Sequence, residues 1–239
     1  MDRLAPTVRP EGNKDGVQTW SNLLFIHWPI DVEVLRPLVP KELTIDTWEG
    51  QAYIGIVPFA MKNVAPWWLP KLFSFDFLET NLRTYVHLDG KDPGVYFFSL
   101  DAESLLAVWA ARMGWGLPYF YAGMDMQQQG DEWIYSMNRR SGEKPAFSVR
   151  YSIGEVLGPS QPGTFEFFLL ERYLLFSQHK GKLMKGQVHH VPYPARKATV
   201  HSCTEGLVAA AGLPATSGLP PIVHYSQGVD VDVFGLKPV

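Results

Sequence analysis

The sequence predicts a mainly β protein, an antiparallel barrel or layered sheet with a few short helices packed on it. Strand-like stretches follow one another with turn signals about every dozen residues, and helical periodicity is confined to short segments. Several stretches, such as VYFFSL at 95–100 and TFEFFLL at 164–170, are apolar at both odd and even positions. Because successive side chains of a strand point to opposite faces, such strands must be covered on both sides.

The first half of the chain reads as strands interrupted by one short helix. Residues 1–18 predict a flexible N-terminal arm, and residues 19–239 a single domain, because no repeat or linker divides them. In order, we expect a strand at 20–30, a short helix at 31–40 capped by Asp31, a hairpin over 43–61 that turns at Glu49–Gly50, a Pro- and Trp-rich loop at 63–72, a strand at 73–88, a turn at 89–94 and a strand at 95–100.

The second half begins with the clearest helical pattern, at 101–114, where Asp101 can act as the N-cap and Gly114 can end the helix. Strands then dominate. We expect them at 117–129, 132–140, 146–154, 164–178 and 183–191, the last two forming a hairpin around 179–182, followed by a second short helix at 202–212 and a strand-like tail at 222–236.

Composition excludes several classes of protein. Hydrophobic residues make up 46% of the 239 residues and aromatic residues 13%, which is ample for a large core. The net charge of -3 has no basic stripe, so a nucleic-acid partner is not expected. No apolar run approaches the roughly 20 residues that span a bilayer, and no signal peptide is visible, so we expect a soluble cytoplasmic protein without a membrane partner.

The usual cofactor and nucleophile motifs are missing from the sequence. It contains no HExxH, no GxGxxG after a strand, no phosphate-binding P-loop and no GxSxG, and the neighbours His189 and His190 would face opposite sides of a strand. We therefore expect neither a metal nor a cofactor. Cys203, the single cysteine, is read either as a small buried residue at a helix start or as a thiol activated there beside His201.

The strand at 73–88 carries polar groups on one face together with aromatic rings. Its alternation places six residues on that face: Phe75, Phe77, Glu79, Asn81, Arg83 and Tyr85. A second polar break, Glu171 and Arg172, interrupts an apolar run. Since a buried ion without a partner costs several kcal/mol, we expect pairs across strands, such as Glu171 with Arg83 or Glu79 with Arg172.

Two interpretations of this polar cluster remain open. It is either an internal ion-pair network that braces a barrel, or the wall of a pocket in which a carboxylate and a guanidinium orient a small acidic or carbonyl ligand. Separately, Trp67 and Trp68 could form an exposed interface patch, which makes a homo-oligomer a further alternative.

Several segments together resemble the YqjF-like family of bacterial proteins, a domain of unknown function in the acetoacetate decarboxylase-like superfamily. They are HWPI at 27–30, LRPLVPKELTIDTWEGQAYIGIVPFAM at 35–61, FLETNLRTYV at 77–86, GVYFFSLDAESLLAVWAAR at 94–112, LPYFYAGM at 117–124, FLLERYLLF at 168–176, HHVPYP at 189–194 and HYSQGVDVDVF at 224–234. The resemblance implies a single domain with an antiparallel β-barrel or cone, helices packed on it and an internal pocket.

The resemblance also bears on chemistry. Acetoacetate decarboxylases form a Schiff base through a lysine in a Gly-x-Pro-Lys-Lys motif that follows the helix. Here that segment is Gly116-Leu117-Pro118-Tyr119-Phe120, so aromatic residues replace both lysines and decarboxylation through an imine is not expected. The superfamily's pocket glutamate matches Glu79 in Phe77-Leu78-Glu79, which implies that this carboxyl keeps its place in the pocket.

Two functions are compatible with these residues. In the first, the pocket binds a small oxo-acid or carbonyl-like ligand without chemistry. In the second, the protein is an enzyme that performs enolisation, hydration or lyase chemistry, with Glu79 and Tyr119 as the catalytic pair. The ligand-binding residues would be Asn81, Arg83, Pro118, Phe120, Glu171 and Arg172. Whether any reaction is catalysed stays open at this point.

Overall fold

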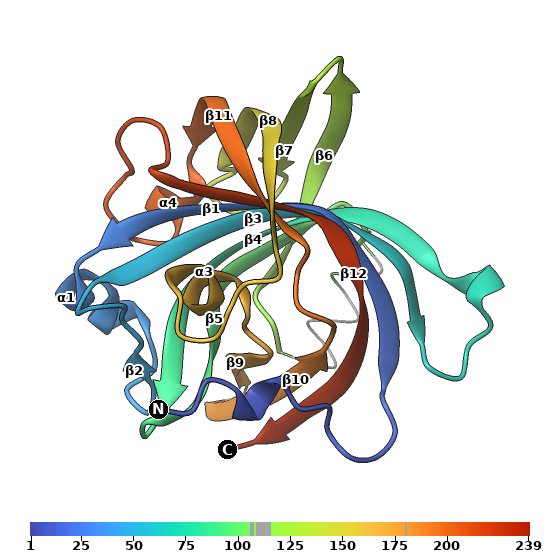
Figure 1. Ribbon diagram of the computed structural model, residues 1–239, viewed down its shortest axis with the longest axis vertical. Coiled ribbons are helices and arrows are strands. Elements are labelled where there is room, and N and C mark those ends of the chain that lie inside the picture. The colour runs from blue at the N-terminus through green and yellow to red at the C-terminus, as the bar shows by residue number, and fades with distance from the viewer. Residues whose placement is uncertain (106–107, 109–115, 180) are drawn as a thin grey trace.

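The described part of the chain, residues 1–105, 108, 116–179 and 181–239 of a computed structural model, forms one sheet of 12 strands with short helices around it (Figure 1). The strands are β1 (Gly16–Ile30), β2 (Thr44–Ile45), β3 (Ala52–Pro66), β4 (Phe75–Leu88), β5 (Lys91–Ala102), β6 (Tyr119–Gln129), β7 (Glu132–Arg139), β8 (Ala146–Gly158), β9 (Leu174–His179), β10 (Lys182–His189), β11 (Ala195–Glu205) and β12 (Ile222–Pro238). The helices are α1 (Val32–Leu35), α3 (Phe165–Leu170) and α4 (Leu207–Ala210), with 3-10 turns at Ala5–Thr7, Arg36–Leu38 and Lys71–Phe73.

The sheet branches at two long strands, β5 and β12. β5 pairs with β4 along its length, with β9 through Gly94–Tyr96 and with β6 through Leu100–Ala102. β12 pairs in the same way with β1, β10 and β11. Two rings therefore share β5, β4, β3, β1 and β12: β9 and β10 close one, and β6, β7, β8 and β11 close the other.

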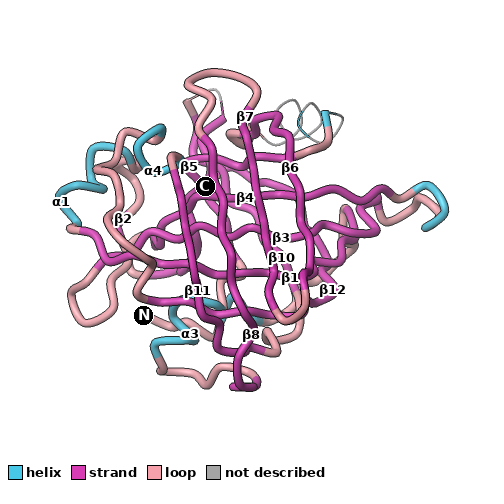
Figure 2. The backbone as a smooth tube through the Cα atoms, turned by 90° about the horizontal axis from the view of Figure 1, so that it is seen from above, coloured by secondary structure: helices cyan, strands magenta, loops and turns pink. Residues whose placement is uncertain are grey.

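This arrangement confirms the predicted mainly β, largely antiparallel barrel with a few short helices. Only the β5–β6 and β5–β9 pairings of the described strands run parallel. Figure 1 shows β1, β3 and β4 crossing the middle, with α3, β9 and β10 on one side and β6, β7, β8 and β11 on the other. Figure 2 shows how little of the described chain is helical and that the helices lie at the periphery.

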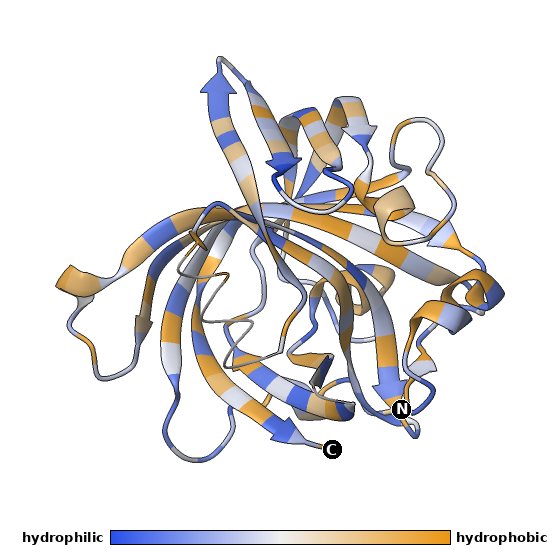
Figure 3. Ribbon diagram, turned by 180° about the vertical axis from the view of Figure 1, so that it is seen from behind, coloured by the Kyte–Doolittle hydropathy of each residue, from blue (hydrophilic) through white to orange (hydrophobic). Residues whose placement is uncertain are grey.

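Two hydrophobic cores lie on opposite faces of the shared strands. On β1, Leu24 and Ile26 pack into one core, while Leu23 and Phe25 belong to the other. β4 alternates in the same way, with Leu82 in the first core and Tyr85 in the second. Figure 3 shows orange, apolar bands along these central strands, whereas the projecting end of the β6–β7 hairpin is blue. Both faces of the shared strands are therefore covered, as their apolar sequences predict.

One predicted strand is wrong at its start. Residues 165–170 form the helix α3, and the strand β9 begins only at Leu174. The Oγ1 atom of Thr164 accepts a hydrogen bond of 3.2 Å from the backbone N–H of Phe167, which caps the helix. A run that is apolar at every position fits a short helix buried on all sides as well as a buried strand, so alternation could not decide between them. The predicted β9–β10 hairpin is confirmed.

The predicted helix at 101–114 does not begin at Asp101, and most of its residues lie outside the described part of the chain. Asp101 belongs to β5, where its buried carboxylate accepts two hydrogen bonds from Arg139, of 2.6 and 2.8 Å, instead of capping a helix. The predicted second helix at 202–212 is also shorter than expected, because β11 continues to Glu205 and α4 begins at Leu207.

The predicted turn at Glu49–Gly50 is present, but the hairpin around it is not. Both residues adopt positive φ values, 50° and 85°, and Trp48 and Gln51 exchange two backbone hydrogen bonds of 2.9 Å. The preceding strand β2 nevertheless pairs with β4 and not with β3. The exposed Trp67 and Trp68 lie between β3 and β4, which leaves the oligomer prediction open.

The N-terminal residues contact the sheet at several points. Arg3 pairs with Asp46, and Arg9 and Lys14 reach Asp232 on β12 at 3.2 and 2.7 Å. β1 then starts at Gly16. Among the described residues, no helix is long and apolar enough to cross a membrane.

Candidate functional site

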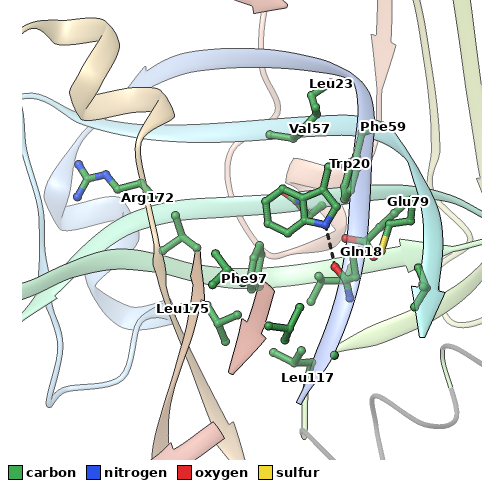
Figure 4. Close-up of a pocket in the computed structure, with 18 of the residues that line it drawn as sticks. Gln18, Trp20, Leu23, Val57, Phe59, Glu79, Phe97, Leu117, Arg172 and Leu175 are labelled. Carbon is green, nitrogen blue, oxygen red and sulfur yellow. Dashed lines mark hydrogen bonds between the residues drawn. The ribbon is translucent and has the colours of Figure 1, made fainter. Parts of the chain in front are cut away.

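A cavity of about 450 Å³ lies inside the ring that β9 and β10 close. Its walls come mainly from alternate residues of β1, β3, β4 and β5, and from the segment around β9 (Figure 4). Most lining side chains are apolar or aromatic. The charged and polar lining residues include Asp15, Gln18, Glu79, Asn81, Arg83, Tyr119, Arg172 and Tyr193. A concave apolar cavity with a few converging polar groups is the usual form of a ligand site.

One face of β4 forms a wall of this cavity. Phe75, Phe77, Glu79, Asn81 and Arg83 all line it, as the alternation of the sequence predicts. The Glu79 and Arg83 side chains are nearly inaccessible to solvent, with relative exposures of 1% and 8%. This face of the strand is therefore a buried polar wall rather than a wet surface.

Glu79 is hydrogen bonded to Tyr119 across this wall. The phenol of Tyr119, at the start of β6, donates to Oε2 of Glu79 at 2.7 Å. Burial raises the pKa of Glu79 to about 8, an effect that hydrogen bonds from Tyr119 and Asn81 oppose and the charge of Asp101 reinforces. Burial and the neighbouring carboxyl raise the pKa of Tyr119 well above its ordinary value. At neutral pH the pair therefore holds a largely protonated carboxyl beside a neutral phenol.

Arg83 is a buried cation without a carboxylate partner among the described residues. The residues outside that part of the chain, 106–107, 109–115 and 180, include no Asp or Glu. Its Nη2 atom donates a long hydrogen bond of 3.4 Å to the carbonyl of Leu169, and its Nε atom is buried without a partner. The guanidinium lies 5.6 Å from the Phe25 ring centre and 5.8 Å from that of Tyr85.

The expected ion pair between Glu79 and Arg172 is wrong, because Arg172 pairs with Asp46. The guanidinium of Arg172 donates to Asp46 at 2.8 Å, and Asp46 also pairs with Arg3. Both cations lower the pKa of Asp46 against the opposing effect of burial. Arg172 lines the cavity, and Figure 4 shows its guanidinium directed away from Trp20 and Glu79. Its partner is 126 residues away in sequence, beyond the reach of local pattern reasoning.

Glu171 does not pair with Arg83, and it is not part of the cavity wall that the described residues form. Its Oε1 atom accepts hydrogen bonds from the backbone N–H of Tyr193 at 3.1 Å and from Ser160 at 3.2 Å, and its Oε2 atom accepts one from Tyr173 at 2.7 Å. Burial raises the pKa of Glu171, while these hydrogen bonds lower it. Glu171 therefore ties together the segments that flank β9 and β10.

The segment that matches the decarboxylase lysine motif reaches the cavity through alternate residues. Leu117 and Tyr119 line the cavity, whereas Pro118 and Phe120 do not belong to the wall described here. The Arg139 guanidinium stacks 3.9 Å from the centre of the Phe120 ring, beside the buried pair that Arg139 forms with Asp101. The structure thus brings Glu79, Asn81, Arg83 and Tyr119 to one cavity and leaves Phe120 and Glu171 outside it.

Trp20 is a lining residue that alternation alone did not identify. Its indole N–H donates to Oε1 of Gln18 at 2.8 Å (Figure 4). Asn22 adopts a φ of 53°, and the β1–β3 register shifts between Ser21 and Ile26. This irregularity reverses the alternation, so Trp20 shares the cavity face with Leu23 instead of the opposite one. Asn22 is the only hint of this irregularity in the sequence of β1, because asparagine adopts positive φ values more readily than most residues, and one asparagine is weak evidence for a bulge.

Metal and thiol chemistry find no support at other positions. The described residues contain no group of three or more His, Cys, Asp or Glu side chains that could hold a metal ion. Cys203 lies in the strand β11 and not at a helix start, and burial raises the pKa of its thiol to about 11. Such a thiol is not activated for nucleophilic attack at neutral pH.

The fold is shared with solved structures of low sequence identity. The enduracididine biosynthesis enzyme MppR complexed with pyruvate matches with a TM-score of 0.64 and 11% identity, over 95% of this chain and 91% of the other. The acetoacetate decarboxylase of Legionella pneumophila subsp. pneumophila str. Philadelphia 1 matches with a TM-score of 0.61 and 12% identity, over 99% of this chain and 93% of that one. These similarities establish an acetoacetate decarboxylase-like fold.

Sequence comparisons give the family. The uncharacterized protein YqjF of Bacillus subtilis (strain 168) is 39% identical over 221 residues, which is 92% of this chain and 90% of that protein. The model of the DUF2071 family, described as "Uncharacterized conserved protein", matches residues 17–230. The chain therefore belongs to the DUF2071 family, and YqjF is one of its relatives.

Proposed function

We propose that the cavity binds a small organic acid and that the guanidinium of Arg83 receives the carboxylate. The observation that carries this proposal is the buried charge of Arg83, which has no carboxylate partner in the described part of the chain. An unpaired buried charge destabilises the protein by several kcal/mol, so a bound anion would relieve a penalty that the fold otherwise bears. Arg83 also presents a planar group suited to bidentate recognition of a carboxylate.

Glu79 and Tyr119 supply the second polar element of the proposed site. With a pKa of about 8, the Glu79 carboxyl carries a proton at neutral pH and can donate a hydrogen bond to a carbonyl or hydroxyl oxygen. A protonated carboxyl adds no negative charge, so it does not repel an anionic ligand. MppR, which shares the fold, is described as complexed with pyruvate, and this supports an oxo acid as the ligand class.

The cavity does not favour chemistry through an imine. No lysine lines it among the described residues, and Tyr119 occupies the segment that matches the decarboxylase motif. Lys62, which stands in a largely apolar sequence context, is exposed on β3. We therefore propose a site that holds an oxo acid without forming a Schiff base with it.

A second candidate function follows from one specific observation, the pKa of Glu79. A carboxyl that titrates near pH 8 is matched to proton transfer at physiological pH, and Tyr119 lies within hydrogen-bond distance of it. Enolisation, hydration or lyase chemistry on the bound acid would use Glu79 as acid and base, with Arg83 holding the carboxylate. This candidate predicts turnover, whereas simple binding does not.

Calorimetry with matched ligands tests the proposal. We expect 2-oxo acids to bind to the intact chain and to raise its melting temperature, and their neutral amides to bind at least about tenfold more weakly, because the amides lack the charge that Arg83 receives. Equal affinity for acids and amides would contradict the proposal. Turnover of any bound acid that is lost in Glu79→Gln, with binding retained, would favour the enzymatic candidate over binding alone.

A further inference from the structure

The polarity of the cavity changes in one direction along β4. Arg83, Asn81 and Glu79 occupy three successive inward positions, and the next two, Phe77 and Phe75, are aromatic. The relative exposure rises from 7% at Phe77 to 39% at Phe75, so the aromatic end is the open end. At about 3.3 Å per residue, the Cα atoms of Arg83 and Phe77 lie roughly 20 Å apart. The β4 wall of the site therefore has a polar inner end and an aromatic outer end.

The other walls are mostly apolar at the same outer end, where Asp15 and Gln18 are polar lining residues. The rings of Phe75 and Phe77 stack with their centres 5.7 Å apart. Trp20 of β1 also lines the cavity, and its ring meets Phe59 edge-on with the ring centres 5.9 Å apart. Figure 4 shows Trp20, Phe97 and Leu117 around the same space as Glu79, with Arg172 at the far side. An apolar or aromatic ligand segment would be buried among these side chains.

The volume of the cavity exceeds what a short oxo acid requires. Liquid water occupies about 30 Å³ per molecule, so 450 Å³ corresponds to roughly 15 non-hydrogen atoms at liquid density. A three-carbon oxo acid such as pyruvate would fill less than half of this space. It would also leave the aromatic outer half in contact with water.

Building on the proposed function, we propose that the ligand is an elongated organic acid with a fixed orientation. Its carboxylate lies at Arg83, an oxygen function lies near Asn81 and Glu79, and an alkyl or aryl chain extends outward past Phe77 to Phe75. The reverse orientation would put a charged carboxylate among aromatic side chains and leave Arg83 unpaired. Desolvation of two unpaired charges would oppose it.

A series of 2-oxo acids of increasing chain length tests this orientation. The probes are pyruvate, 2-oxobutanoate, 2-oxohexanoate, 2-oxooctanoate, 2-oxododecanoate and phenylpyruvate, each measured by calorimetry against its own amide on the intact protein. Each added methylene that becomes buried is expected to lower Kd about fourfold, until the chain reaches the mouth of the cavity. Phenylpyruvate is expected to bind more tightly than pyruvate by a factor of ten or more.

Two matched variants locate the chain of the ligand. Phe75 lines the outer cavity and is 39% exposed, whereas Phe73 is 64% exposed and does not line it. In Phe75→Ala, Kd for 2-oxododecanoate, whose chain is long enough to approach Phe75 from Arg83, should rise about three- to tenfold with little change for pyruvate. Phe73→Ala should change neither value. Because both side chains are substantially exposed, neither truncation should prevent folding.

The outcomes separate this inference from the proposed function. Acids that outcompete their amides but show no dependence on chain length would overturn the elongated ligand and leave an acid-binding cavity intact. Affinity that rises with chain length equally for acids and amides would overturn the acid-binding function, and the proposed orientation with it. A Phe75→Ala effect of the same size on pyruvate and 2-oxododecanoate would also overturn the orientation.

Discussion

The phenol of Tyr119 donates a hydrogen bond of 2.7 Å to Oε2 of Glu79, and both groups are buried in the cavity wall. In the resemblance to acetoacetate decarboxylases, Tyr119 stands in the segment where those enzymes carry a lysine. A phenol cannot form an imine, but it can hold a carboxyl in place and adjust its acidity. The acidity of Glu79 and its hydrogen bond with Tyr119 can therefore be tested independently of ligand binding.

Removing the phenol oxygen should make Glu79 a weaker acid. The hydrogen bond from Tyr119 lowers the pKa of Glu79, so Tyr119→Phe should move that pKa further above about 8. Titration of ¹³C-labelled glutamate carboxyls by NMR measures the change. Tyr121→Phe, on the same strand, is the matched control and should leave the midpoint unchanged. A midpoint below the wild-type value in Tyr119→Phe would contradict the account.

The stability of the protein should carry a signature of Glu79. Its pKa is raised from 4.5 when unfolded to about 8 when folded, so between these values the folded state binds more protons than the unfolded state. This contribution is fully present below pH 4.5 and is lost as the pH rises through about 8. The free energy of unfolding should fall by up to about 1.4 kcal/mol per pH unit in that window.

Comparison with Glu79→Gln isolates this contribution. Burial lowers the pKa of His27, and the charges of Arg83 and His224 add to the shift, so His27 contributes the opposite slope near its unfolded value of 6.5. Subtracting urea-unfolding curves of Glu79→Gln from those of the wild type, pH by pH, removes the shared His27 effect. The same slope in both proteins would show that Glu79 is ionised in the folded state.

Two buried arginines of the cavity should respond to truncation with opposite signs. Arg83→Met removes a charge without a carboxylate partner among the described residues and should raise the free energy of unfolding by about 1 kcal/mol or more. Arg172→Met breaks a buried pair with Asp46 and should lower it by about 3 kcal/mol. Chemical denaturation of both variants measures the difference. Equal destabilisation would mean that Arg83 is structural, and binding alone would not explain its position.

The wild-type protein should not form a reducible adduct with oxo acids. No lysine lines the cavity in the described part of the chain, so borohydride treatment with pyruvate or acetoacetate should leave the mass of the protein unchanged. Mass spectrometry after reduction gives the result, and a solved acetoacetate decarboxylase of the same fold serves as the positive control. A stoichiometric mass increase located on a single lysine would contradict this reading.

Local sequence patterns predicted the direction of side chains within regular strands, and little beyond that. Alternation over 73–88 places Phe77, Glu79 and Arg83 on one face, because a strand fixes side-chain direction whatever surrounds it. The same alternation fails at Trp20, because an irregularity at Asn22 reverses the faces within β1. Strand positions could therefore be predicted only where the ladder is regular.

Long-range partners lay beyond local reasoning. The rule that buried charges are paired correctly predicts that Arg172 needs a carboxylate, but the partner is Asp46, which lies 126 residues away. The same rule fails for Arg83, which has no such partner in the described residues. A departure of this kind from ordinary pairing is expected where a ligand completes the site.

The most direct measurement is the affinity of the wild type and of Arg83→Met for the same 2-oxo acid, determined by calorimetry at neutral pH. Arg83→Met should fold, keep or gain stability, and bind the acid at least about tenfold more weakly than the wild type. Its affinity for the neutral amide should stay close to that of the wild type. An unchanged affinity for the acid in a folded Arg83→Met protein would show that Arg83 does not receive the carboxylate.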